Sequence, residues 1–344
     1  MRLLSIGDQV RPGLYRLHSR FDRAVNFERA GRLVSVVDET IGPGPLSIVL
    51  RDLKLALAQG YAEPALSILK GLHPSAQGWI ASPVPGDPTL GNRPRKIPNP
   101  EGVESPSGTT LPLCVTASTV LFDDHRYRFT SRHRYNSTLD LQALDPARYR
   151  RNLSTLGDAL LEDAPPGSLA FVLDSTRRKN FRRGVEQTVA GQIGRGVHQV
   201  FHGNLLEGIR QLRGCGFGLT PAGDDFIAGL LLGLHLLQRL RGQELQPTVD
   251  AIFRAARGGN IFSNTFLDLA RRGLMFGGMK DLLLAMMSGT RPSLRKAAKR
   301  LFAVGETSGA DLATGLFMTL QFGLATADRP SAHPVPRCRR RAGR

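Results

Sequence analysis

A glycine-rich run that leads into a long apolar segment constrains this chain more than any other feature. Residues 214–225 carry glycine at positions 214, 216, 218 and 223 and end in Asp224 and Asp225. Residues 226–237 are apolar around the whole circumference of a helix, which predicts a helix buried on all sides. A glycine turn at such a helix start gathers backbone N–H groups and the positive end of the helix dipole. The pattern predicts an anion site with two carboxylates beside it.

The same pattern occurs a second time. Residues 223–230 align with residues 309–316, and both read glycine, any residue, aspartate, an apolar residue, two more residues, glycine and leucine. In each copy the aspartate, Asp225 or Asp311, shares one helix face with the glycine four residues later. Hydroxyl residues lie just upstream in both copies: Thr220 in the first, and Thr307 and Ser308 in the second. Two such helix starts, if they face each other, would hold one ligand between them.

Helix capping is the alternative interpretation of both motifs. Thr220 before Pro221 is a suitable N-cap with proline at the first helical position, and acidic residues favour the first turn. Ser308 and Asp311 have the spacing of a capping box. For one motif alone, capping and ligand binding have equal weight. Capping does not explain the closely spaced glycines of the first copy, because glycine weakens a chain that has no need to bend. The repeat favours a site.

Composition indicates a protein of the cytoplasm. The chain has 344 residues, of which 41% are hydrophobic and 22% charged, as in globular proteins with ample core. Its longest apolar run, 226–237, is too short to cross a bilayer, and its first ten residues lack the apolar core of a signal peptide. The three cysteines lack the spacing of metal ligands and suit a reducing compartment.

The net charge of +17 raises the alternative of a nucleic-acid-associated or scaffold protein. Part of the excess lies in a basic tail, residues 329–344, for which we expect disorder. Arginines at 126, 128, 132 and 134 alternate with aromatic residues, so a strand there would carry arginines on one face and rings on the other. A half-buried strand with its rings in the core is favoured over a nucleic-acid platform, because no known reader motif is present.

The order of predicted elements indicates an α+β fold with a β-rich first part and a mainly helical second part. We expect a β-rich domain over 1–145, with a proline-rich excursion over 77–112, and a helical domain over 146–328. The predicted strands cover 33–37, 46–50, 113–116, 125–135 and 169–173. The predicted helices cover 51–59, 64–72, 146–162, 176–212, 222–240, 246–257, 262–272, 278–288, 291–303 and 309–325. Ser263 is the predicted cap of the helix over 262–272.

The glycine run resembles the hallmark of a bacterial family, the AllH-like proteins, named after the AllH subunit of oxamate carbamoyltransferase. That hallmark is a run like GLGPGLTPSGDDF, and here it reads GCGFGLTPAGDDF. The resemblance extends to residues 18–27, 42–46, 260–263 and 305–311. Phe217 stands where the family usually has proline, and Ala222 where it often has serine, so loop rigidity and hydrogen bonding can differ.

The resemblance implies a role in allantoin or purine-nitrogen breakdown, in which a carbamoyl group moves between oxamate and phosphate. It also implies a chain that works beside other subunits and is inactive alone. Family members need not share one substrate, and fold transfers better than reaction. A small-molecule anion and further subunits are therefore the expected partners, with no membrane partner and nucleic acid disfavoured.

Carbamoyl transfer from a carbamoyl phosphate needs an anion cradle, donors for a developing oxyanion and a group that takes a proton from the attacking amine. The candidate catalytic residues are Asp224, Asp225 and Asp311, and which of them is the base stays open. The candidate binding residues are Gly216, Gly218, Thr220, Gly223, Asn260, Ser263, Thr307, Ser308, Gly309 and, through the resemblance, Asn26. The residues identify no definite cofactor, and Mg²⁺ held through water by Asp224 and Asp225 is an open alternative.

Two further candidates have simpler explanations. His198 and His202 lie four apart on one helix face, as in a metal pair, but no third ligand accompanies them, so a packed pair is favoured. Cys215 lies near a helix start, where a thiolate is stabilised, yet a small buried side chain is favoured. The sequence thus predicts a carbamoyltransferase-like subunit. A nucleotide-dependent phosphotransferase stays an alternative, weakened by the absence of a P-loop lysine and spacing.

Overall fold

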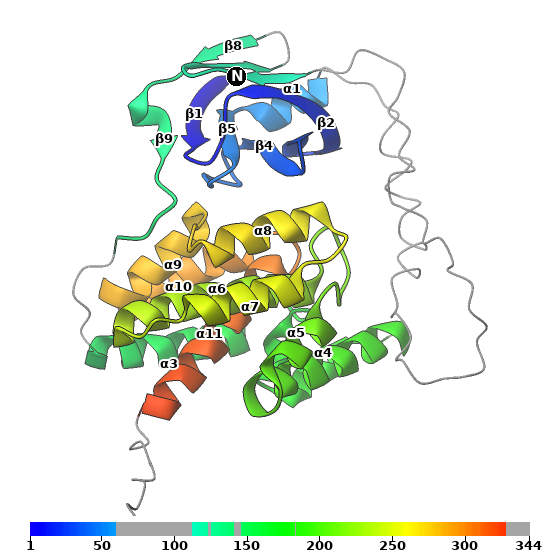
Figure 1. The fold of residues 1–344 in the computed structure, drawn as a ribbon, viewed down its shortest axis with the longest axis vertical. Helices are drawn as coiled ribbons and strands as arrows, with labels where there is room; N and C mark the ends of the chain where they lie inside the picture. Colours follow the sequence, from blue (N-terminus) through cyan, green and yellow to red (C-terminus); the bar gives the residue numbers. More distant parts are fainter. Residues whose placement is uncertain (60–111, 123–124, 141–145, 183, 328–344) are drawn as a thin grey trace, which may run out of the picture. The chain divides into compact units, whose positions relative to one another are not determined.

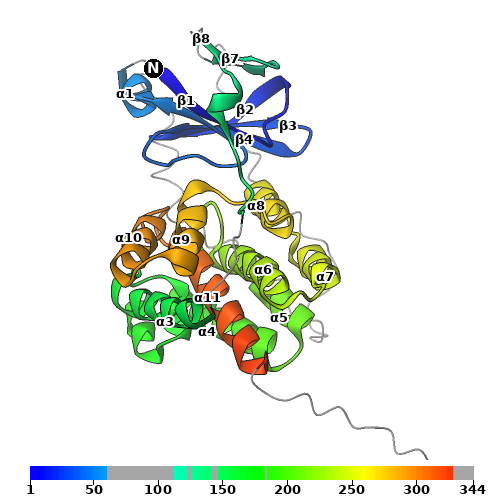
Figure 2. The ribbon, with the colours of Figure 1, turned by 90° about the vertical axis from the view of Figure 1, so that its left-hand side faces the viewer.

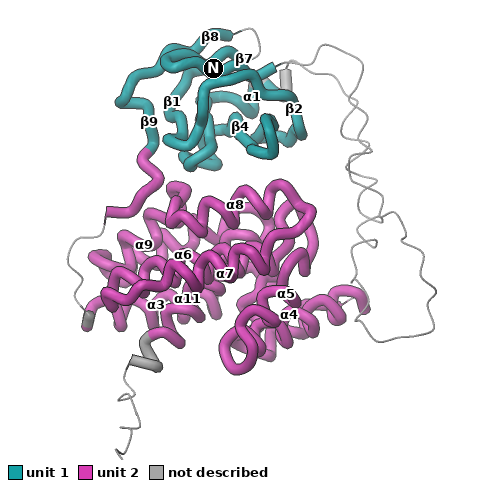
Figure 3. Tube along the Cα trace, in the orientation of Figure 1, with its two compact units in different colours: residues 1–135 teal, residues 136–344 magenta. Residues whose placement is uncertain are grey.

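The computed structural model describes residues 1–59, 112–122, 125–140, 146–182 and 184–327. It divides into two compact units, Met1–Tyr135 and Asn136–Arg344, which Figure 3 colours separately. The predicted helix over 64–72, most of the excursion over 77–112 and the tail over 329–344 lie outside the described residues.

The first unit is a sheet of nine strands in the described residues, in the order β8-β7-β6-β2-β3-β4-β5-β1-β9 (Figure 1). The strands are β1 (Arg2–Gly7), β2 (Gly13–Phe21), β3 (Ala24–Arg29), β4 (Arg32–Asp38), β5 (Ser47–Arg51), β6 (Leu113–Val115), β7 (Thr119–Phe122), β8 (His125–Arg128) and β9 (Arg134–Tyr135). The short helix α1 (Leu53–Gln59) follows β5, and a 3-10 turn, η3 (Ser131–His133), precedes β9. Neighbouring strands are antiparallel except β4 with β5 and β1 with β9.

Alternating side chains give the sheet its core. Phe27, Val36 and Ile48 are fully buried, and the rings of Phe27 and Phe122 meet edge to face at 6.0 Å. The strands predicted over 33–37, 46–50 and 113–116 are confirmed. The strand predicted over 125–135 is interrupted by η3, but its expected division between rings and arginines is found: Tyr127 is buried, while Arg126 and Arg128 are exposed.

The second unit contains only helices in its described residues. They are α3 (Pro146–Asp163), α4 (Gly184–His202), α5 (Leu205–Leu212), α6 (Ala222–Arg241), α7 (Gln246–Ala256), α8 (Ile261–Arg271), α9 (Gly277–Ser288), α10 (Arg291–Phe302) and α11 (Ser308–Ala327), with 3-10 turns η4 (Leu169–Val172) and η5 (Ser175–Asn180). The α+β class is confirmed. No helix in the described part of the chain is both long and apolar enough to cross a membrane.

Two predictions for this unit were wrong in detail. Residues 169–173 form the 3-10 turn η4 instead of a strand, because a short apolar run reads alike in a buried strand and a buried helical turn. Their burial comes from packing among helices. The helix predicted over 176–212 is divided into η5, α4 and α5, and Asn204 caps α5 by accepting a hydrogen bond from the Glu207 N–H.

Helices α6 and α11 form the centre of this unit and lie side by side (Figures 1 and 2). They are parallel, since Gly229 of α6 abuts Leu312 and Leu316 while Gly233, one turn later, abuts Thr319. The contact is reciprocal: Gly315 of α11 abuts Phe226 and Leu230, the residues of α6 that align with Leu312 and Leu316. Glycine in each motif therefore lets the two backbones touch.

We predict that Gly229→Ala lowers the free energy of unfolding by ~2 kcal/mol or more, because its Cβ atom would lie 1.9 Å from Leu312 O and force the helices apart. Thermal unfolding followed by far-ultraviolet circular dichroism measures the change. The matched control is Gly191→Ala in α4, where the nearest side-chain atom would be 3.7 Å away. There the better helix propensity of alanine should leave stability unchanged or raised. Equal effects of the two substitutions would contradict the close contact.

Candidate functional site

The starts of α6 and α11 meet, and with them the two repeated motifs. The hydroxyl Oγ atoms of Thr220 and Ser308 lie 3.2 Å apart although the residues are 88 positions apart in the chain. Both side chains are partly exposed. The parallel packing of the two helices explains the meeting, because aligned positions in parallel helices come to the same level. The expectation that both motifs surround one place agrees with this geometry.

Asp225 lies directly beneath this hydroxyl pair. Its carboxylate accepts a hydrogen bond from Thr220 Oγ1 at 3.1 Å, and the side chain is 7% exposed. Burial raises the pKa of Asp225 well above its ordinary value, the Ser308 and Thr220 hydroxyls partly offset this, and the carboxylates of Asp311 and Asp224 raise it further. Asp225 is thus a buried carboxylic acid in contact with two partly exposed hydroxyls.

Asp311 is buried completely and lies close enough to Asp225 to affect its charge. Its Oδ1 atom accepts the backbone N–H of Leu169 at 2.6 Å, while Oδ2 is buried without a hydrogen-bond partner among the described residues. Burial raises the pKa of Asp311 to about 7, against the lowering effects of the Leu169 N–H and the Thr307 hydroxyl. Two neighbouring acids with raised pKa values resist being ionised together, so the pair can hold a proton near neutral pH.

Asp224 has a different position from its neighbour. It turns back to the glycine loop, where Oδ1 accepts the Gly214 N–H at 2.8 Å. Burial raises its pKa, and the Gly214 N–H and the nearby Ser263 hydroxyl lower it in part. Through this hydrogen bond Asp224 holds the glycine loop against the start of α6. This separates the roles of the two adjacent carboxylates, which the sequence left equivalent.

The glycine loop needs its glycines for backbone shape and for close approach. Gly216 has a φ of 130° and Gly218 a φ of 95°, which side-chain-bearing residues rarely adopt. A Cβ atom at Gly223 would lie 2.1 Å from Leu212 O. The N–H of Gly223 donates to Cys215 O, whereas the N–H groups of residues 216–220 donate to no other described residue. Those five amides are the open part of the expected cradle.

Asn260 and Ser263 support the loop from α8. Asn260, not Ser263 as predicted, caps this helix: its Oδ1 accepts from Phe262 N and Ser263 N, and its Nδ2 donates to Leu219 O at 2.8 Å. Ser263 lies within the first turn, 4% exposed, with Oγ near Asp224 but without a hydrogen bond of ordinary geometry among the described residues. Asn260 thus contacts the glycine loop, and Ser263 lies beside Asp224.

Thr307 and Gly309 lie at the start of α11. Thr307 O accepts the N–H groups of Ala310 and Asp311, and Gly309 packs against Leu301 O, where a Cβ atom would lie 1.8 Å away. Asn26 belongs to the first unit, in β3. Its Nδ2 donates to Ser19 Oγ and its Oδ1 accepts from Ser35 Oγ, so its amide holds neighbouring strands together.

Capping does not account for either motif. Pro221 occupies the N-cap position of α6, one residue later than predicted, and Thr220 donates to Asp225 instead of accepting from the helix. Asp311 accepts the backbone N–H of Leu169 in η4, and no described backbone N–H at the start of its own helix donates to it as a capping box would require. Leu169 was not identified from the sequence. Nothing in its neighbourhood signals a bond to a residue 142 positions away.

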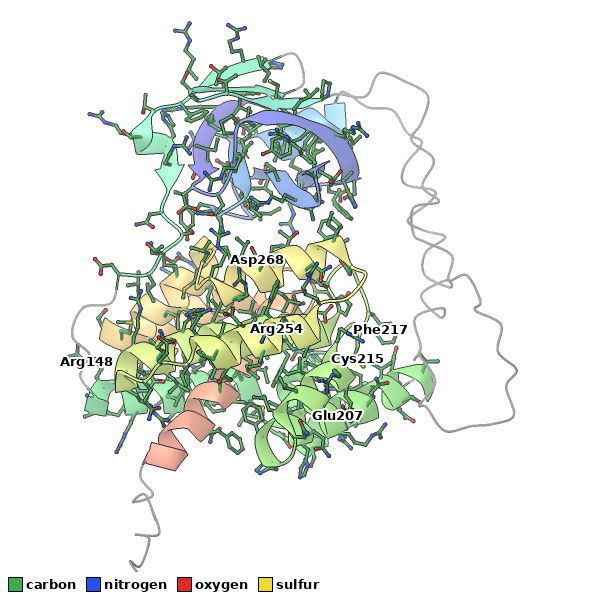
Figure 4. All side chains as sticks on the ribbon, viewed as in Figure 1. Arg148, Glu207, Cys215, Phe217, Arg254 and Asp268 are labelled. Atoms are coloured by element: carbon green, nitrogen blue, oxygen red, sulfur yellow. The ribbon has the colours of Figure 1, made fainter. Side chains whose placement is uncertain are left out.

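The two minor candidates have structural explanations. Figure 4 labels Cys215 and Phe217 on the loop before α6, where Cys215 is buried and Phe217 is 46% exposed. Burial raises the pKa of Cys215 to about 11, followed by the effect of Asp224, so no thiolate forms at neutral pH. The rings of His198 and His202 lie 5.1 Å apart at a tilted angle, and His202 also meets Phe322 edge to face.

The donor set does not fit a resident metal. Asp224 and Asp311 each accept a backbone N–H, and no three metal-ligating side chains of the described residues are grouped to hold an ion. The site instead contains the backbone N–H groups of residues 216–220, two neighbouring hydroxyls and two buried carboxylic acids. Such groups bind an anion, stabilise developing negative charge and accept a proton.

Comparison with known families agrees with the resemblance in the sequence. Residues 212–320 match the family model described as oxamate carbamoyltransferase subunit AllH. The match covers the glycine loop, α6 and the start of α11, so the helix starts described above belong to the matched stretch. The chain is thereby related to a carbamoyltransferase subunit at a coarse level. No curated protein and no solved structure matches it.

We predict that the stability of the protein depends on the ionisation of Asp311. An acid whose pKa is raised to about 7 by folding binds more protons in the folded than in the unfolded chain. Its contribution to stability is therefore present at low pH and is lost as the pH rises through about 7. Asp311→Asn keeps the acceptor for Leu169 N and removes this titration.

Urea unfolding between about pH 5 and about pH 8 measures the effect. The wild-type protein should lose stability relative to Asp311→Asn as the pH rises, by at most ~3 kcal/mol over the range. Exposed Asp281→Asn in α9 is the matched control and should run parallel to wild type. A constant difference between wild type and Asp311→Asn would contradict the raised pKa.

Proposed function

We propose that this protein is a cytoplasmic subunit of a carbamoyltransferase-like enzyme of purine or allantoin nitrogen breakdown. It binds a small anion such as carbamoyl phosphate, oxamate or oxalurate where α6 and α11 begin. One observation carries the proposal: the Thr220 and Ser308 hydroxyls meet at 3.2 Å, and Thr220 donates to the buried carboxylate of Asp225. The AllH match over 212–320 supports the reaction class.

Each group in the proposed site has a distinct task. The amides of 216–220 hold the anionic end of the ligand, since they donate to no other described residue. Ser308 and the same amides donate to the oxygen that gains negative charge as the carbamoyl carbon is attacked, while Thr220 donates its one hydroxyl proton to Asp225. Asp225, when ionised, accepts the proton that leaves the attacking amine, because burial raises its pKa and so makes it a stronger base than an ordinary carboxylate.

The remaining carboxylates position these groups. Asp311 lies beside Asp225 and favours its protonation, while its bond to Leu169 N fixes η4 against α11. Asp224 and Asn260 fix the two ends of the glycine loop through Gly214 N and Leu219 O. Since the family description names a subunit, further chains are expected to complete the enzyme.

Isothermal titration of the full chain with carbamoyl phosphate, oxamate, oxalurate and Mg-nucleotides tests the proposal. We predict binding of at least one of the first three ligands, and a loss of at least about tenfold in affinity for Thr220→Val combined with Ser308→Ala. Asp225→Ala combined with Asp311→Ala should abolish binding. Both hydroxyl substitutions keep side-chain volume and leave the buried acids in place.

Thr265→Val in α8 is the matched control, because that partly buried hydroxyl only donates to Ile261 O within its own helix. It should bind like wild type. Wild-type affinity in the Asp225/Asp311 double variant would remove the site assignment. Binding of Mg-nucleotides alone would instead favour the phosphotransferase alternative.

A further inference from the structure

The helical unit contains a second hollow, near the other end of α6. Its floor is apolar and its rim is polar and basic: the floor is Leu236, Met275 and Leu283, and the rim is His235, Arg239 and Arg272. Its cavity volume is about 90 Å³, with room for several water molecules or one small organic molecule, and its mouth is open to solvent. His235 is ten residues beyond Asp225, or about 15 Å along the helix, so this hollow is separate from the proposed carbamoyl site.

The charge of the hollow is positive. No carboxylate is among the described residues that line it, while two arginines are. One N–H of Arg239 donates to Leu139 O at 2.9 Å, which fixes the guanidinium at the rim. Arg272 lies 3.7 Å from Asp268 of its own helix, a distance typical of a loose surface pair. A planar guanidinium held in this way matches a carboxylate, which it can bind through two parallel hydrogen bonds.

The walls of the hollow are held in place by the chain itself. The ring of His235 is fixed by a 2.7 Å hydrogen bond between Nε2 and Arg271 O. Gly273 lies against this ring: its φ of 67° favours glycine, and a Cβ atom there would lie 3.4 Å from the ring. Leu283 is fully buried, and Leu236 and Met275 are 3% and 5% exposed, so the floor is a fixed part of the core.

We propose that this hollow binds a small organic monoanion, with its carboxylate on Arg239 and Arg272 and its apolar body on Leu236, Met275 and Leu283. An apolar floor below two cations selects for both parts of such a molecule. Inorganic anions gain nothing from the floor, and neutral apolar molecules gain nothing from the arginines. The proposal is independent of the function proposed above, because the two sites share no residue.

Isothermal titration of the full chain with benzoate tests the site, with benzamide as the uncharged analogue and acetate as the anion without an apolar body. Benzoate should bind at least about tenfold more tightly than either. Arg239→Gln should weaken benzoate binding by about tenfold or more, and Arg272→Gln should weaken it as well. The Thr220→Val and Ser308→Ala double variant should bind benzoate like wild type.

Arg254→Gln is the matched control, since Arg254 is an exposed arginine on α7 (Figure 4) that does not line the hollow. It should leave benzoate binding unchanged. Equal affinity for benzoate and benzamide, equal losses at Arg239 and Arg254, or no binding of benzoate by wild type would each overturn the proposal. The three-ligand comparison on wild type decides the matter even if an arginine variant fails to fold.

Discussion

The structure of the helical unit depends on the backbone contact between α6 and α11. Gly229 packs against Leu312 and Leu316 of α11, and Gly315 packs against the aligned residues Phe226 and Leu230 of α6. The two helices therefore run parallel and in register. Register is what brings Thr220 within 3.2 Å of Ser308 and Asp225 beside Asp311. A larger side chain at either glycine would separate the helices and the paired helix starts together. Packing and chemistry in this unit therefore rest on the same two positions.

Burial of acids at the helix starts changes where an anion can bind. The positive ends of the dipoles of α6 and α11 already face the carboxylates of Asp225 and Asp311, which are 7% and 0% exposed. An anion at that spot would meet like charge whenever these acids are ionised. Residues 216–220 are partly or fully exposed, and their N–H groups donate to no other described residue. In the function proposed above, these amides would hold the anion while Asp225 takes the proton, so the two tasks would fall to separate groups.

Much of this arrangement could be predicted because the signals are local. The all-round apolar runs after Asp225 and Asp311 predicted α6 and α11 to within two residues, and the repeat predicted that their starts belong together. The roles of single acids could not be predicted, because they depend on partners distant in sequence. Asp311 bonds to Leu169, and Asp224 bonds to Gly214 instead of acting beside its neighbour. The early strands β1, β2 and β3 were also missed, since their charged residues obscure the alternation.

The two aligned helix starts are not chemically equal. At the start of α6, Asp224 accepts the Gly214 N–H and so holds the glycine loop in place. At the start of α11 the aligned residue is Ala310, and no comparable glycine loop precedes it. A symmetric pair would present the same surface twice and would accept a bound molecule either way round. Here one side offers backbone amides and the other a hydroxyl at the head of α11. A molecule with two unlike ends would be held in a single orientation, which sets the direction in which a group can leave it.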